Sequence, residues 1–249
     1  MQFGQSQEPT PNTAPEGQSF APGMYGDPRA GLKADVGQFM SGVMGWMAAG
    51  LGVTALVSMF LSTNEELITA LVTTPLWYVA LFGPLVYVWI MQSRLPRMTP
   101  KRATFSFLLY SAMIGVMMAP LVAMYIANAP NTLVACFLGT SGMFAGMAAF
   151  GYLTKRDLSA FGRFFTMMIF GLLAMYVVSF FVPGVYWYVA LIGLPLFAGL
   201  TAYDTQKIKQ IYLERGGQGN LAILGALRLY IDFINMFLFM LRLMGGNRD

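Results

Sequence analysis

The sequence predicts an all-α membrane protein with seven transmembrane helices. Hydrophobic residues make up 57% of the 249 residues and charged residues only 10%, and the mean hydropathy is +0.60. A soluble domain carries about 25% charged residues, so this composition excludes one. From Phe39 onward the chain alternates between short polar loops and apolar stretches of about 20 residues, the length that a helix needs to cross the hydrocarbon core of a bilayer.

Each apolar stretch is interpreted as one membrane-spanning helix. Small residues within them, such as Gly142, Gly146 and Ala149, favour close packing between helices. The predicted spans are Phe39–Leu61, Leu71–Met91, Ala103–Ile126, Thr132–Leu153, Phe164–Val182, Tyr186–Asp204 and Leu221–Met244.

The residues before the first span have a different composition. Residues 1–38 are rich in Pro, Gly, Gln and Ser and contain no long apolar run. Such a segment cannot bury enough apolar surface to offset the entropy of folding. We therefore predict a disordered cytoplasmic tail over residues 1–38 and a transmembrane domain over residues 39–249.

The basic residues predict the orientation of the helices. All but two of the 15 Lys and Arg residues lie before the first span or around alternate loops, and the exceptions are Arg242 and Arg248. Basic loops face the cytoplasm, which places the N-terminus there. With seven spans the C-terminus is outside, unless the last segment is re-entrant. The short cytoplasmic loops favour a bacterial inner membrane.

The rare residue types exclude several kinds of chemistry. The chain contains no histidine and one cysteine, Cys136, so a zinc site, a serine triad and a disulfide are not expected. In a chain this apolar the basic residues set topology, so we expect no nucleic-acid partner. We also expect no tightly bound cofactor and no enzyme activity. Any response to pH must come from carboxylates.

Two acidic residues lie inside the predicted spans, Asp204 in the sixth and Asp232 in the seventh. Charged side chains in hydrocarbon are costly and commonly mark functional sites. Asp204 lies three residues before Lys207 and is expected to be shallow, whereas Asp232 is expected about 10 Å into its helix. Arg228, Asp232 and Asn235 follow the spacing i, i+4 and i+7, which predicts a polar stripe on one helix face.

The two aspartates allow two interpretations. Each could be neutralised within its own helix, Asp204 by Lys207 and Asp232 by Arg228. Alternatively, the aspartates form a pair. Two neighbouring carboxyls in a low dielectric cannot both ionise cheaply, so they would share a proton near working pH. When both are deprotonated, their oxygens suit a transient calcium ion, and the site would act as a proton-gated cation pathway.

Three segments resemble the Bax inhibitor family, and its bacterial members most closely: YLTKRDLSAFGRFF, AYDTQKIKQIY and LYIDFINMFLFMLRLMG. The resemblance covers roughly residues 39–245. It implies six helices around a central seventh, with a calcium leak regulated by pH through Asp204 and Asp232. It also implies a basic latch for the aspartates at the cytoplasmic end of the second span, where Arg94 stands and Arg97 competes.

Two other functions remain open from the sequence. Some bacterial relatives restrain a membrane-bound ATP-dependent protease, and the N-terminal tail could contact such a partner. An intramembrane aspartyl protease would also carry one aspartate on each of two helices. Its second aspartate requires a Gly-x-Gly-Asp motif, however, and here Leu229, Tyr230 and Ile231 precede Asp232, which disfavours catalysis.

Overall fold

The computed structural model describes residues 28–182, 184–216 and 220–245, without the side chains of residues 28–34 and 215. The chain divides into two units, residues 1–35 and 36–249, and the second contains the helical bundle. Most of the predicted tail, residues 1–27, lies outside the described residues. Helix α1 (Pro28–Ser62) begins well before Phe39, because Pro28 suits the first turn of a helix and the polar residues after it form helix readily.

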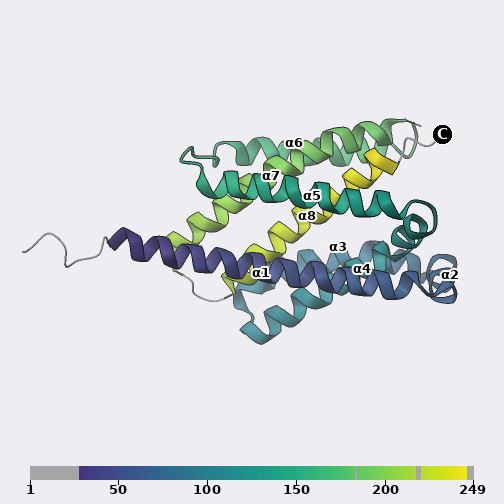
Figure 1. Cartoon of the computed structure of the whole chain (residues 1–249), viewed down its shortest axis with the longest axis horizontal. Coiled ribbons are helices and arrows are strands. Elements are labelled where there is room, and N and C mark those ends of the chain that lie inside the picture. Colours follow the sequence, from purple (N-terminus) through teal and green to yellow (C-terminus); the bar gives the residue numbers. More distant parts are fainter. Residues whose placement is uncertain (1–27, 183, 217–219, 246–249) are drawn as a thin grey trace, which may run out of the picture. The chain divides into compact units, whose positions relative to one another are not determined.

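The described residues contain seven helices that are long and apolar enough to cross a membrane, which confirms the predicted number (Figure 1). They form no β-strand. A short helix, α2 (Glu65–Thr73), lies between the first and second of the seven. After α1 and α2, the chain continues through α3 (Leu76–Arg94), the 3-10 turn η1 (Leu95–Arg97), α4 (Pro100–Asn128), α5 (Pro130–Leu153), α6 (Phe161–Val178), α7 (Val185–Arg215) and α8 (Leu221–Gly245).

Two predicted spans have the wrong bounds. The stretch predicted as Leu71–Met91 is divided at Thr74 and Pro75, between α2 and α3. Proline lacks the N–H that would continue the helical hydrogen bonds. The sixth span was expected to end at Asp204, but α7 continues for eleven further residues to Arg215. Hydropathy falls at the charged residues, whereas the helix itself ends only before Gly216, which has a φ of 63°.

Helix α8 crosses the whole length of the bundle. At its start, the side-chain amide of Asn220 donates to the carbonyl oxygens of Leu95 (3.0 Å) and Met98 (2.6 Å), just before α4 begins. Near its end, the hydroxyl of Tyr125, in the last turn of α4, donates to the carbonyl oxygen of Leu241 at 2.9 Å. Because the two ends of α8 contact opposite ends of α4, the last segment spans the bundle and is not re-entrant.

Helix α8 also has the largest buried fraction of the seven spans. Its Tyr230 is fully buried, and the Tyr230 hydroxyl lies 2.5 Å from the hydroxyl of Thr54 in α1. The Thr54 hydroxyl is in turn 2.9 Å from the carbonyl oxygen of Ser111 in α4. Side chains of α8 therefore tie together helices that are distant in sequence, while the arrangement of six helices around α8 remains a prediction.

Candidate functional site

The two intramembrane aspartates lie on α7 and α8, which share the most extensive contact of any pair of described helices. The side chain of Asp204 is 17% exposed, and Asp232 as a whole is only 4% exposed. Arg228 pairs with Asp204 across the two helices, and Asp232 lies one turn after Arg228 in α8, on the same face of the helix. The structure thus brings together three of the residues that the sequence singled out.

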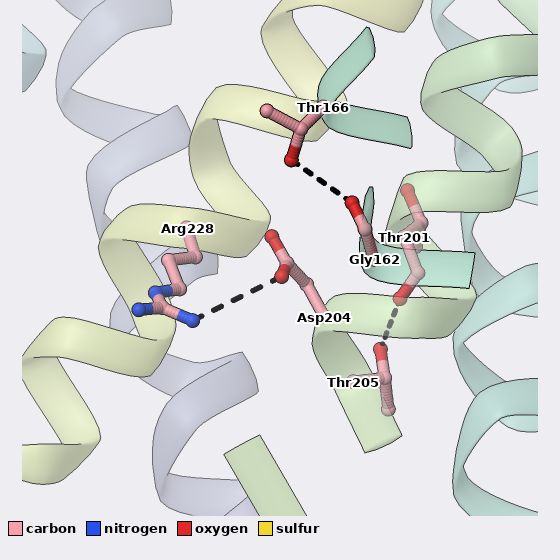
Figure 2. Close-up of polar contacts among 6 residues, drawn as sticks. All are labelled: Gly162, Thr166, Thr201, Asp204, Thr205 and Arg228. Carbon is pink, nitrogen blue, oxygen red and sulfur yellow. Dashed lines mark hydrogen bonds and ion pairs between the residues drawn. The ribbon is translucent and has the colours of Figure 1, made fainter. Parts of the chain in front are cut away.

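Arg228 forms an ion pair across the two helices (Figure 2). Its Nη1 lies 3.9 Å from Oδ1 of Asp204, and this is the only salt bridge within the part of the chain that the structure describes. The described side chains therefore show neither a Lys207–Asp204 nor an Arg228–Asp232 ion pair, the two contacts that the interpretation of local neutralisation required. Helix spacing makes Asp232 a possible partner for Arg228, but the packing of α7 against α8 offers Asp204 instead.

Asp232 is left with an unsatisfied oxygen. Its Oδ2 is buried and has no hydrogen-bond partner among the described residues. A buried polar atom without a partner is costly, and a buried negative charge more so. A proton or a cation at this oxygen would relieve the cost.

The neighbouring hydroxyl groups do not compete for Asp204 (Figure 2). The Thr205 hydroxyl donates to the carbonyl oxygen of Thr201 at 2.7 Å, within α7. The Thr166 hydroxyl donates to the carbonyl oxygen of Gly162 at 2.9 Å, within α6. Asp204 therefore depends on Arg228 for its charge partner.

Two other predicted site residues lie outside this cluster of contacts. The Asn235 amide donates to the carbonyl oxygen of Ile231 at 2.8 Å, one turn earlier in α8. Arg94 is exposed in the last turn of α3 and forms no ion pair among the described side chains. In this structure Arg228, and not Arg94, is the basic residue that holds an aspartate.

The aspartates offer few ligands to a resident metal. In the described ranges, no three His, Cys, Asp or Glu side chains come together. Calcium takes six to eight oxygen ligands in proteins, and Asp204 and Asp232 supply only two carboxylates.

Sequence reasoning did not assign a role to Gln206, which connects α7 to the loop between α5 and α6. Its side-chain oxygen accepts from the backbone N–H of Leu158 at 2.7 Å, and its nitrogen donates to the carbonyl oxygen of Arg156 at 2.8 Å. One turn further on, Nζ of Lys209 donates to the carbonyl oxygen of Tyr152 at 2.9 Å. The loop after α5 is thus fastened to the helix that carries Asp204. The only signal in the sequence was a glutamine two residues after that aspartate.

The same loop contains its own turn. The backbone N–H of Ser159 donates to Oδ1 of Asp157 at 2.9 Å. This hydrogen bond favours the ionised carboxylate and holds the pKa of Asp157 below its usual range. Asp157 therefore stays charged at neutral pH.

Replacing Gln206 with Ala should loosen the loop between α5 and α6. The change removes both hydrogen bonds, which are partly buried, and each typically contributes a net of about 0.5–1.5 kcal/mol. Limited digestion with trypsin should then cut faster after Lys155 and Arg156. A Gln92→Ala variant, altered at an exposed position in α3, is the control. Equal cleavage rates in both variants would show that Gln206 does not hold the loop.

The chain is similar to known membrane proteins over most of its length. A family model described as "Inhibitor of apoptosis-promoting Bax1" matches residues 36–249. The inner membrane protein YbhL of Escherichia coli K12 is 36% identical over 229 residues, which cover 89% of this chain and 95% of YbhL. The protein YrjE of Lactococcus lactis is 39% identical over 221 residues, covering 85% of this chain and 93% of YrjE. A Deinococcus radiodurans protein is 37% identical over 216 residues.

Proposed function

Because this chain belongs to the Bax inhibitor family, we propose that it is a pH-sensitive calcium leak channel of the membrane, gated by Asp204 and Asp232. The observation that carries the proposal is the unsatisfied Oδ2 of Asp232, buried beside the ion pair of Asp204 and Arg228. Two carboxylates face one guanidinium here, so one negative charge would have no partner if both aspartates were ionised. The number of protons bound to the two aspartates must therefore depend on pH.

The gate follows from competition for Arg228. With one aspartate protonated, Arg228 balances the other, and α7 and α8 are joined by the ion pair. With both deprotonated, a single guanidinium faces two carboxylates, and the extra negative charge in a low dielectric attracts a divalent cation. Calcium would then balance part of the negative charge that Arg228 balances otherwise. The ion pair between α7 and α8 would become weaker as a result.

Reconstitution in liposomes tests the function. Vesicles that contain the purified protein and a calcium-sensitive dye are expected to take up calcium faster than empty vesicles, with a rate that changes between mildly acidic and mildly alkaline pH. No histidine is present to supply such a response. Uptake equal to that of empty vesicles at every pH would refute the proposal.

Of the two alternative functions, the partnership with a membrane protease remains a prediction from the sequence, and the aspartyl protease remains disfavoured by the missing Gly-x-Gly-Asp motif. A partnership with an ATP-dependent membrane protease was tied to the N-terminal tail, most of which lies outside the described residues. Deleting residues 1–27 and measuring turnover of protease substrates would test it. The cytoplasmic location of the N-terminus is likewise a prediction, based on the basic loops.

A further inference from the structure

Arg242 lies near the C-terminal end of α8, at the opposite end of the helix from Arg228. Ten residues separate it from Asp232, about 15 Å along the helix. Its guanidinium donates to the hydroxyl of Tyr176 in α6. The guanidinium carbon also lies 4.2 Å from the ring centre of Tyr186, 5.0 Å from that of Tyr176 and 5.7 Å from that of Phe239. Aromatic rings from three helices therefore hold this cation.

Among the described side chains, no carboxylate lies beside the charge of Arg242. Within the described residues no acidic oxygen comes within ion-pair distance of it, and its Nη1 is buried without a hydrogen-bond partner. An arginine that merely anchored the helix at the membrane surface would extend its guanidinium into water. Here the guanidinium folds onto the rings, so a positive charge stays at this end of the bundle.

Arg242 and Phe239 extend the polar stripe of α8. The positions 228, 232, 235, 239 and 242 follow the spacing 4, 3, 4, 3, which places them on one helix face. The two ends of this face both contact α7. Arg228 meets Asp204 at one end, and Arg242 meets Tyr186 at the other, where it also contacts Tyr176 of α6. The face of α8 that carries Asp232 therefore meets α7 at both of its ends, and we call this contact the seam between α7 and α8.

Phe239 closes this seam between Asn235 and Arg242. Its ring centre is 5.7 Å from that of Phe197 in α7. An ideal Cβ built on Gly193 of α7 would lie 2.6 Å from the nearest ring carbon of Phe239, so the ring fits only because residue 193 is glycine. The result is a tightly packed apolar contact between α7 and α8, followed along α8 by a fixed positive charge.

We propose that Phe239 and Arg242 form the second barrier of the cation pathway, at the end away from the aspartates. Phe239 constricts the seam between α7 and α8, and Arg242 repels cations and so limits the rate and the cation selectivity of the leak. The inference rests on the proposed function, and it assigns the residues that oppose permeation rather than those that sense pH.

The test compares Arg242→Gln with Arg242→Lys in calcium-loaded liposomes. The glutamine variant removes the charge, and calcium flux should rise roughly tenfold, since a full charge near the path contributes strongly in a partly desolvated site. The lysine variant loses the planar stacking but keeps the charge, and its flux should stay near the wild-type level. Permeability to chloride relative to calcium should fall only in the glutamine variant.

Phe239→Ala provides a second variant, which removes the ring but keeps the charge of Arg242, and it should also raise calcium flux. Equal increases in the lysine and glutamine variants would show that Arg242 acts as a clamp between helices, which overturns the charge barrier. Unchanged flux in Arg242→Gln and Phe239→Ala, with normal pH-dependent flux in the wild type, would overturn the second barrier alone. Absence of wild-type flux would overturn the proposed function as well.

Discussion

Replacing Asp232 with Asn should abolish the pH dependence of calcium flux. The amide has nearly the same size as the carboxyl, so packing is preserved, but it cannot gain or lose a proton. With Asp232 neutral at every pH, Arg228 always balances Asp204, and the competition that would drive the gate disappears. Flux should then be constant across the pH range in which the wild-type rate changes.

The matched control is Asp157→Asn, the same chemical change in the exposed loop between α5 and α6. In the wild type, the N–H of Ser159 already lowers the pKa of the Asp157 carboxyl, so the charge of Asp157 does not change in the tested range. The variant should therefore keep the wild-type pH profile. A second readout is thermal unfolding in detergent. Because Asp232 is 4% exposed and leaves an oxygen unpaired, its replacement should not lower the midpoint. A wild-type pH profile in Asp232→Asn would exclude this residue as the sensor.

Replacing Gly151 with Ala should strongly destabilise the bundle. An ideal Cβ at Gly151 in α5 would collide with the carbonyl oxygen of Ala202 in α7 and lie 2.8 Å from the carbonyl carbon and Cα of the same residue. These are backbone atoms, so no side-chain rotation can relieve the overlap, and α5 and α7 must separate. Overpacking of this kind costs about 1–3 kcal/mol, or more where the backbone must move. Ala202 lies two residues before Asp204, so the site would be disturbed too.

Gly146→Ala in the same helix is the control for this prediction. An added Cβ at Gly146 meets nothing within 4 Å, and alanine favours helix over glycine by about 1 kcal/mol in water. The midpoint of thermal unfolding should therefore fall in Gly151→Ala and stay level or rise slightly in Gly146→Ala. Similar midpoints in the two variants would show that α5 and α7 are not in tight contact at Gly151.

The glycines illustrate a limit of sequence reasoning in this chain. Spacing favoured Gly142 and Gly146 as residues of close helix packing, yet both are exposed and have open space where a Cβ would lie. Close approaches occur at other glycines instead, Gly151 and Gly193 among them. Small-residue spacing reports which positions permit contact, but the partner helix decides which of them is used.

The sequence by itself determined the number of membrane-spanning helices, the two intramembrane aspartates and the family, because these depend on local apolar length, on residue type and on short motifs. Only the tertiary structure decided that Arg228 pairs with Asp204 rather than Asp232, that Gln206 fastens the loop after α5, and that Arg242 rests on aromatic rings from three helices. These contacts join helices that are separate in sequence. The periodicity of one helix fixes which side chains share a face, but not which neighbouring helix that face meets.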